Sequence, residues 1–405
     1  MLALKGSFMR YKSIAKQFVR LFSLLTMFVV CIPTVQGQTL TTLYSFQGGT
    51  DGAWPNGGLF RDRSGNLYGT TEYGGYSSNE TCRDLGCGTV FKLSPDGRKL
   101  VYRFRGRNGA LPVAGVIGVN DKIYGTTQRG NPGAGTVFDI SRTGEDVFHF
   151  TDGLPGAGPN AALIPDKQGN LYGTTSGGGE FSRGVVFEYD AAGNETVLYS
   201  FRGVRKNGND GASPMAALVM DQAGNLYGTT SSGGSGAGCG TVFELSGTRE
   251  SVLYRFSGGT DGCSPFAEVA LDSEGNFYGT TLLGGDPSCN SNGSCGVVFK
   301  LTSSGVETLL HTFTGGEDGA YPNTSVLLDG NGGLYGAASN GGTNDCGTIF
   351  RIDHEGHFST LYEFSGPDGC APQGDLILDS DGNIYGVTGV GGAFNSGTLF
   401  RLTPD

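Results

Sequence analysis

The heptapeptide Gly-Asn-Leu-Tyr-Gly-Thr-Thr occupies residues 65–71 and recurs intact at residues 169–175 and 224–230. Four variants of it occupy residues 121–127, 275–281, 332–338 and 382–388. The tyrosines of successive copies are 48 to 57 residues apart. A repeat of this period is typical of arrays and closed rings built from one supersecondary unit.

Three other motifs also occur seven times, in phase with the heptapeptide. One is Gly-Thr/Val-Val/Ile/Leu-Phe, with phenylalanines at 91, 138, 187, 243, 299, 350 and 400. Another is a hydrophobic run ending in phenylalanine at 46, 104, 150, 201, 256, 313 and 364. The last is Gly-Ala/Cys-x-Pro, with prolines at 55, 112, 159, 214, 265, 322 and 372 in a slightly variable form.

Each copy of the unit contains four short segments rich in β-branched and aromatic residues. In the fourth copy these are residues 215–220, 225–230, 241–245 and 252–256, separated by Gly, Asn, Asp and Ser. Short strands divided by turn residues predict an antiparallel meander. Four such strands at this spacing are typical of a β-propeller blade.

The two ends of the repeat predict how the ring closes. After residue 37 the chain begins with a fourth-type strand at 41–46, and it ends with a third-type strand at 398–402. Pairing of these strands would complete the last sheet and remove an exposed edge. We therefore predict an all-β fold, a seven-bladed β-propeller of four-stranded antiparallel blades closed by the N-terminal strand in the last blade.

The first 37 residues have the features of a secretory signal peptide. Residues 1–20 contain five basic residues and no acid, and a 12-residue apolar run follows at 21–32. A membrane span needs about 20 residues, so cleavage after Gly37 is favoured over a permanent anchor, with lipidation of Cys31 as the alternative. We expect residues 38–405 to form one secreted, periplasmic or cell-surface domain without a membrane span.

The charge of the mature chain limits its partners. Removal of residues 1–37 leaves 22 basic and 38 acidic residues, a net charge of −16. Such a surface repels phosphate backbones, which excludes nucleic acid as a partner. We expect the domain to be a monomer.

Eight cysteines remain after residue 37, an even number that predicts disulfides in an exported protein. Two cysteines that precede third strands each have a partner 24 residues later in the next blade. Two others have a cysteine within their own loop instead. The predicted pairs are Cys82–Cys87, Cys239–Cys263, Cys289–Cys295 and Cys346–Cys370, and buried free thiols are the alternative.

Five connections between units carry an aspartate directly before a glycine. Aspartate at this position normally stabilises a tight turn, and a ligand- or cation-binding role is the alternative. The five candidates are Asp51, Asp210, Asp261, Asp318 and Asp368.

Two aromatic residues precede prolines of the repeat. Trp54, the single tryptophan, and Tyr321 are candidate platforms for a sugar or a protein partner, because aromatic faces bury large areas with little loss of entropy. Packing at a blade junction is the alternative interpretation.

The sequence offers no catalytic constellation. The four histidines share no repeat position, and no nucleophile elbow, phosphate-binding loop or metalloprotease signature is present. We predict no catalytic residue, metal or cofactor, with a metal or general-base role for His354 and His357 as the alternative.

The motifs Gly-Asn-Leu-Tyr-Gly-Thr-Thr, Gly-Thr-Val-Phe-x-Leu and Leu-Tyr-x-Phe-x-Gly-Gly-x-Asp-Gly resemble the bacterial GloVer tandem-repeat proteins, also described as choice-of-anchor proteins. The resemblance covers residues 41–405 and implies an exported bacterial repeat protein without implying a reaction. We expect a non-catalytic binding or surface-interaction module whose partner is a carbohydrate or another surface protein. The alternatives are a lyase or hydrolase acting on a carbohydrate or small molecule in the central funnel, and a structural component of the envelope or matrix.

Overall fold

The computed structural model describes residues 38–403, apart from 76–81, 83–84, 98, 131–132, 142–143, 150–155, 206–207, 235 and 290–293. Residues 38–404 form one compact unit. The signal peptide, the cleavage after Gly37 and the lipidation of Cys31 fall outside the described residues. No helix in the described part of the chain is long and apolar enough to cross a membrane.

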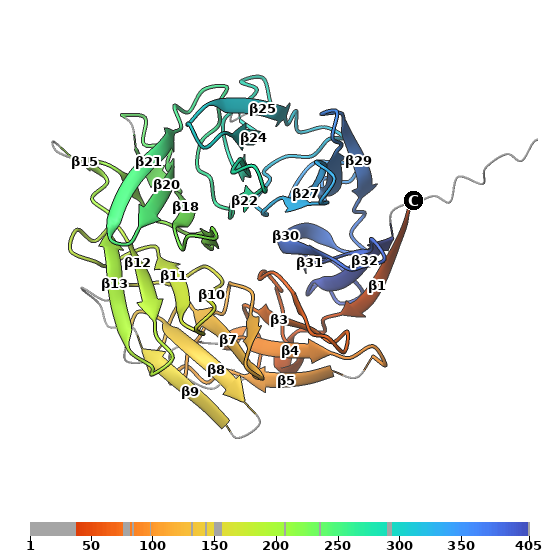
Figure 1. The fold of residues 1–405 in the computed structure, drawn as a ribbon. Helices are drawn as coiled ribbons and strands as arrows, with labels where there is room; N and C mark the ends of the chain where they lie inside the picture. Colours follow the sequence, from red (N-terminus) through yellow and green to blue (C-terminus); the bar gives the residue numbers. More distant parts are fainter. Residues whose placement is uncertain are drawn as a thin grey trace, which may run out of the picture. The chain divides into compact units, whose positions relative to one another are not determined.

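Seven four-stranded antiparallel sheets form a ring, as predicted (Figure 1). Blade 1 contains β2 (Phe60–Arg61), β3 (Leu67–Thr71), β4 (Thr89–Leu93) and β5 (Lys99–Arg103). Blade 2 contains β6 (Ile117–Val119), β7 (Lys122–Thr127), β8 (Thr136–Ser141) and β9 (Gly144–His149). Blade 3 contains β10 (Ile164–Pro165), β11 (Leu171–Thr175), β12 (Val185–Tyr189) and β13 (Glu195–Ser200). Blade 4 contains β17 (Val219–Met220), β18 (Leu226–Thr230), β20 (Thr241–Ser246) and β21 (Arg249–Arg255).

The remaining blades follow the same order. Blade 5 contains β22 (Ala270–Leu271), β23 (Phe277–Thr281), β24 (Val297–Leu301) and β25 (Glu307–Thr312). Blade 6 contains β26 (Leu327–Leu328), β27 (Leu334–Ala338), β28 (Thr348–Ile352) and β29 (Phe358–Glu363). Blade 7 contains β30 (Cys370–Leu378), β31 (Ile384–Val390), β32 (Thr398–Thr403) and β1 (Thr39–Ser45). Short ribbons pair β14 (Val204–Arg205) with β15 (Gly208–Asn209) and β16 (Gly211–Ala212) with β19 (Ser232–Gly233), and η1 (Gly49–Asp51) is a single 3-10 turn.

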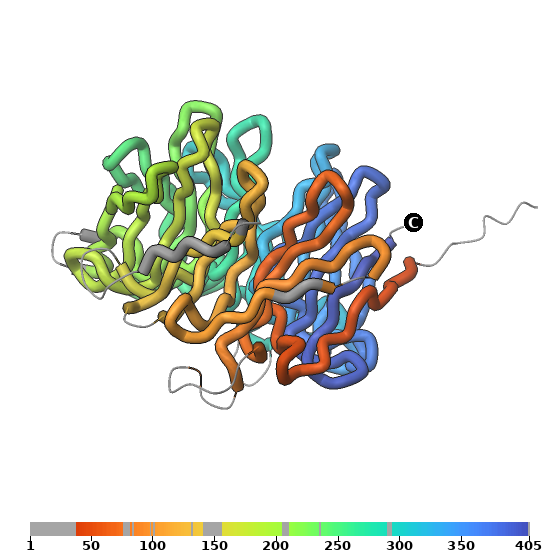
Figure 2. Tube along the Cα trace, turned by 90° about the horizontal axis from the view of Figure 1, so that it is seen from below, coloured from red at the N-terminus to blue at the C-terminus, as the bar shows by residue number. Residues whose placement is uncertain are grey.

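The N-terminal strand closes the ring. β1 pairs antiparallel with β32, and Thr42 lies opposite Phe400. In Figure 2 the red N-terminal strand runs beside the blue strands of the C-terminus. The first strand of each blade lies toward the centre and the fourth at the periphery (Figure 1). Interblade connections such as residues 314–326 and second-to-third-strand loops such as 339–347 meet on one face, which we term the upper face.

The heptapeptide contains the turn chemistry of the first hairpin. In blade 4, Asp221 Oδ1 accepts hydrogen bonds from the backbone N–H groups of Ala223 and Asn225. Its Oδ2 accepts from Asn225 Nδ2 at 2.8 Å and from the hydroxyl of Tyr227 at 3.1 Å. The Asn and the Tyr of the motif therefore hold the hairpin aspartate, which is a structural role. The same arrangement surrounds Asp379, so the hairpin at residues 379–383 is a turn of the same kind.

The Gly and Thr residues of the heptapeptide pack the sheets together. A Cβ at Gly228 would lie 2.9 Å from the ring of Phe243 on the neighbouring strand, so only glycine leaves room for that ring. The hydroxyl of Thr229 donates to the carbonyl of Ala267 in the next blade at 3.1 Å. Thr230 shares a 2.8 Å hydrogen bond with Thr241 on β20.

Phenylalanines join neighbouring blades. A fourth-strand ring of one blade meets a third-strand ring of the next edge-to-face, as Phe256 meets Phe299 with centroids 5.2 Å apart. Both rings are fully buried. The equivalent pairs are Phe46–Phe91, Phe104–Phe138, Phe201–Phe243, Phe313–Phe350 and Phe364–Phe400.

All four predicted disulfides are present. Cys239–Cys263 and Cys346–Cys370 each join a loop on the upper face to the connection that enters the next blade. Cys82–Cys87 and Cys289–Cys295 close short loops within a blade. The predictions succeeded because a repeat position has one location in every blade.

Candidate functional site

A cavity of ≈ 320 Å³ lies where the segments entering the innermost strands converge. Each of these segments begins at a proline of the repeat. The first residues after the prolines all line the cavity, namely Asn56, Val113, Asn160, Met215, Phe266, Asn323 and Gln373. Most third residues also line it, namely Gly58, Gly115, Ala162, Ala217, Glu268 and Asp375. We term this space the central cavity.

Six of the seven second residues after the prolines are glycine or alanine, and these line the cavity where the blades pack closely. A Cβ on Gly57 would lie 2.3 Å from the backbone of Ala114 in blade 2, and a Cβ on Gly374 would lie 2.6 Å from the backbone of Gly57. Alanines at the equivalent positions are buried, including Ala161, Ala216 and Ala267. Because small residues let the inner segments approach closely, their neighbours on either side project toward the axis.

Amide side chains form the upper part of the cavity wall. Gln128 Nε2 donates to Asn160 Oδ1 at 2.9 Å across the boundary of blades 2 and 3, and Asn160 Nδ2 donates to Ser176 Oγ at 3.0 Å. Asn56 Nδ2 donates to Glu72 Oε2. The Oδ1 atoms of Asn56 and Asn323 are buried and accept no hydrogen bond from the described residues. Such buried acceptors are costly unless a ligand or water satisfies them.

Two carboxyl groups also face the central cavity. Asp375 Oδ1 accepts a hydrogen bond from the backbone N–H of Ser325 at 3.0 Å, which links blades 6 and 7. Burial raises the pKa of Glu268 to about 8, and the negative charge of Asp375 adds to the effect. Among the described residues, Asp375 is the one charged group that shifts the pKa of Glu268 appreciably. None of the residues that line the cavity is basic. At neutral pH the Glu268 carboxyl therefore holds its proton and can donate a hydrogen bond.

The five candidate aspartates lie apart, one in each of five interblade connections. Each accepts hydrogen bonds from a backbone N–H four or more residues earlier, or three in the case of Asp368, and from an aromatic side chain of the preceding fourth strand. Asp261, for example, accepts from the N–H of Ser257 at 2.7 Å and from the hydroxyl of Tyr254 at 3.2 Å. Asp51, Asp210, Asp318 and Asp368 are held in the same way by Tyr44, Tyr199, His311 and Tyr362. This geometry supports the turn role.

The residues before the repeat prolines adopt a left-handed backbone in all seven blades, with φ between 53° and 65°. Their N–H groups donate to the preceding blade, as Trp54 N donates to the carbonyl of Ser396 at 3.1 Å. Trp54 is 45% exposed and meets Tyr73 edge-to-face with centroids 5.3 Å apart. Tyr321 is partly buried and packs against a core cluster that includes Cys295 and Ala320. The two candidate platforms therefore lie in different blades and different environments.

Sequence comparison identifies the repeat. The Gloeobacter/Verrucomicrobia repeat matches residues 32–236, 146–293 and 287–405. The chain belongs to the Gloeobacter/Verrucomicrobia repeat family. This confirms the resemblance drawn from the motifs. No curated protein matches the chain.

Solved propellers resemble this Gloeobacter/Verrucomicrobia repeat protein in fold. PorZ of Porphyromonas gingivalis, a bacterial surface component of the type-IX secretion system, matches with a TM-score of 0.53 and 13% identity over 88% of this chain and 47% of its own. A gluconolactonase from Xanthomonas campestris matches with a TM-score of 0.41 and 14% identity over 91% of this chain and 90% of its own. A luciferin-regenerating enzyme matches with a TM-score of 0.41 and 13% identity over 91% of this chain and 95% of its own.

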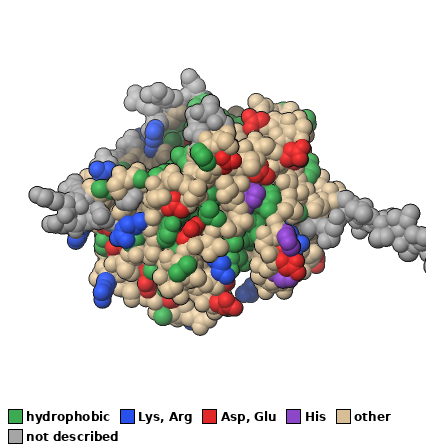
Figure 3. All heavy atoms as spheres, turned by 90° about the horizontal axis from the view of Figure 1, so that it is seen from above, with side chains coloured by type: hydrophobic (Ala, Val, Ile, Leu, Met, Phe, Trp, Pro, Cys, Tyr) green, Lys and Arg blue, Asp and Glu red, His purple; other side chains and the backbone are tan. Residues whose placement is uncertain are grey.

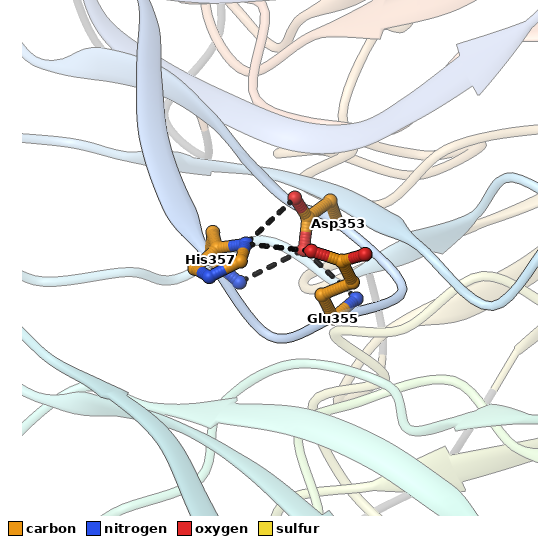
Figure 4. Close-up of side chains that lie close together, drawn as sticks. All are labelled: Asp353, Glu355 and His357. Atoms are coloured by element: carbon orange, nitrogen blue, oxygen red, sulfur yellow. Dashed lines mark hydrogen bonds and ion pairs between the residues drawn. The ribbon is translucent and has the colours of Figure 1, made fainter.

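Among the described residues of the repeat protein, one cluster brings three possible metal ligands close together, in the hairpin between β28 and β29 (Figure 4). His357 Nδ1 lies 3.2 Å from Asp353 Oδ2 and 3.5 Å from Glu355 Oε2. Asp353 Oδ1 already accepts the backbone N–H groups of Glu355 and His357. The His357 side chain is 72% exposed. The geometry is that of a solvated turn.

The propeller fold predicted a central funnel, but the sequence did not identify the residues that line it. These residues follow the repeat prolines and differ from blade to blade. Variation at one repeat position from blade to blade was itself a signal, because residues that serve only packing would be the same in every blade. The two carboxyl groups could not be paired from sequence, because Glu268 and Asp375 belong to blades 5 and 7 and meet only in the closed ring.

Proposed function

We propose that this protein is an exported, non-catalytic binding module that takes a neutral, hydroxyl-rich solute, a carbohydrate, into the central cavity. The observation that carries the proposal is the cavity wall, where amides and two carboxyl groups project from equivalent positions around the axis. A cavity with a few convergent polar groups is the usual form of a small-molecule site.

The chemistry of the wall favours hydroxyl groups. Amides and carboxyls both donate and accept hydrogen bonds, as vicinal hydroxyls require. The absence of Lys, Arg and His from the residues that line the cavity disfavours phosphates and carboxylates.

Two further observations support export and a small ligand rather than a large protein partner. Four disulfides fit an oxidising compartment and hence export. One side of the ring shows acidic, basic and hydrophobic side chains interspersed, without a continuous patch of one kind (Figure 3). That side therefore offers little for a large protein partner.

Isothermal titration calorimetry with a panel of neutral mono- and oligosaccharides tests the proposal. We expect Asn160→Ala and Asp375→Ala to weaken binding at least tenfold, because each removes a polar group from the wall. Asp381→Ala, in an exposed hairpin, is the matched control and should bind like the wild type. Equal affinity of all four proteins would refute the central cavity as the site.

A second candidate function is hydrolysis of the same ligand class. It is favoured by Glu268, whose raised pKa of about 8 keeps it protonated near neutral pH, so that it could act as a general acid. Release of nitrophenol from p-nitrophenyl glycosides that is lost in Glu268→Gln would support the enzyme. No release by the wild type would leave the binding module as the function.

A further inference from the structure

A second pocket opens on the upper face beside the central cavity. It has a volume of ≈ 380 Å³ and is lined by Thr50, Ala53, Trp54, Tyr73 and Leu85 together with four glycines. It lies where blade 7 meets blade 1, since the N–H of Trp54 donates to Ser396 of blade 7. We term it the seam pocket.

The seam pocket is unusually apolar for an exposed position. Trp54 is 45% exposed and Leu85 is 63% exposed. Both line the pocket, and they are two of the six exposed large hydrophobic side chains among the described residues. Exposed apolar side chains that lie together mark an interaction site.

The backbone fixes the position of the tryptophan. Its carbonyl accepts the N–H of Glu72 at 2.9 Å, and Ala53 exchanges two backbone hydrogen bonds with Tyr73. Tyr73 then supports the indole edge-to-face. A rigid aromatic platform loses little entropy on binding.

The size of the seam pocket points to a sugar ring. Trp54 exposes roughly 100 Å² of its surface, whereas a stable protein interface covers about 800 Å² on each partner. The apolar C–H face of a pyranose matches an indole in area, and its hydroxyls remain free for polar neighbours. A flat, single platform therefore fits one sugar unit better than a protein.

Two short chain segments connect the seam pocket to the central cavity. Asn56 follows Trp54 by two residues, and Glu72 directly precedes Tyr73, while Asn56 and Glu72 are hydrogen-bonded at the central cavity. Two residues of extended chain span about 7 Å, which is the scale of one or two linked sugar units. One ligand could therefore reach both sites.

We propose that the seam pocket is a subsite that stacks one pyranose ring on Trp54, so that the ligand of the central cavity is an oligosaccharide of at least two units. This inference rests on the proposed function. Other blades have Leu111, Gly158, Ser213, Ser264 or Ala371 at the position of Trp54 and Tyr321 packed on the core, so the subsite occurs once in the ring.

The single tryptophan makes the test direct. Cellotetraose, maltotetraose, laminaritetraose and mannotetraose are titrated against the protein, with glucose and mannose for comparison, by calorimetry and by acrylamide quenching of Trp54 emission. We expect a bound tetrasaccharide to protect Trp54 from quenching. We also expect Trp54→Ala to weaken tetrasaccharide binding about tenfold while monosaccharide binding is unchanged, and Trp54→Phe to restore most of the affinity.

Val306→Ala is the control, because Val306 is also an exposed hydrophobic residue, at 59% against 45% for Trp54, but lies in the hairpin between β24 and β25. Circular dichroism verifies that each variant is folded. Tetrasaccharide binding that Trp54→Ala leaves unchanged, with no protection of Trp54, would overturn the subsite and leave the central cavity as the site. Binding that depends on Trp54 but not on Asn160 or Asp375 would keep the subsite and refute the central cavity. No binding of any sugar would overturn both.

Discussion

The hydroxyl of Thr229 in blade 4 donates to the carbonyl of Ala267 in blade 5 at 3.1 Å, and both groups are buried. The first threonine of the heptapeptide thus joins each of blades 1 to 5 to the inner segment of the next. Thr70, Thr126, Thr174 and Thr280 make the equivalent bond. Blade 6 has Ala337 at this position. There the hydroxyl of Thr324 donates to the carbonyl of Ala337 and accepts from its N–H instead. The inner wall of the ring therefore depends on these bonds.

Replacement of Thr229 by valine should destabilise the propeller by about 1–3 kcal/mol, because it leaves a buried carbonyl without its partner at nearly constant volume. The free energy of unfolding in urea measures the effect. Thr308→Val, on the exposed face of β25, is the control and should change stability by less than about 0.5 kcal/mol. Equal stability of the two variants would contradict the interblade role.

The ion pair of Lys99 and Asp51 secures the junction at which the ring closes. Lys99 Nζ lies 2.8 Å from Asp51 Oδ1 and 4.5 Å from the ring centroid of Tyr44 on β1. Its side chain is only 9% exposed. Lys99→Ala should therefore lower the free energy of unfolding by about 3 kcal/mol, because it leaves the partly buried carboxylate of Asp51 without its ion-pair partner.

His357→Ala is the control for that substitution. His357 lies 3.2 Å from Asp353, but its side chain is 72% exposed and that of Asp353 is 32% exposed, so its loss should cost less than about 1 kcal/mol. Thermal unfolding of both variants gives the comparison. A smaller loss for Lys99→Ala than for His357→Ala would show that the seam does not rely on the pair.

The repeat allowed the fold, the ring closure and the disulfides to be predicted, because each motif position has one place in a blade. Asp51 illustrates the limit of this reasoning. Its turn role followed from the Asp-Gly dipeptide, but its contact with Lys99 is 48 residues away and belongs to a position that varies. Residues that differ between copies, such as Glu268 and Asp375, carry no periodic signal. Their meeting depends on the geometry of the closed ring.

The position of Lys99 offers a way to strengthen the other junctions. Strand register places Glu307 at the same point of blade 5, opposite Leu301 as Lys99 is opposite Leu93. There it faces Asp261, whose negative charge raises the pKa of Glu307 in addition to burial. Glu307→Lys should replace repulsion by attraction and stabilise the protein by about 1 kcal/mol at pH 7. A melting temperature below that of the wild type would contradict this equivalence.

Stability should fall as the pH rises from about 4.5 to above 7. Burial raises the pKa of Glu195 and of Glu250 to about 7, and their Oε1 atoms are buried without a partner among the described residues. The folded protein therefore keeps protons that the unfolded chain releases in this range, so the free energy of unfolding decreases with pH. Below about pH 4 the sign reverses, because Asp318, whose pKa its hydrogen bonds to His311 and Thr314 hold below the usual value, must take up a proton.

Thermal unfolding between pH 3 and pH 9 measures this profile, with a maximum expected near pH 5. Glu195→Gln should stabilise the protein at pH 8 and have little effect at pH 4, because the amide removes the cost of burying a charge. Glu355→Gln, on the exposed hairpin of blade 6, should leave the profile unchanged. A wild-type profile that rises between pH 5 and pH 8, or a Glu195→Gln effect that is equal at both pH values, would show that these carboxyls ionise freely in the folded ring.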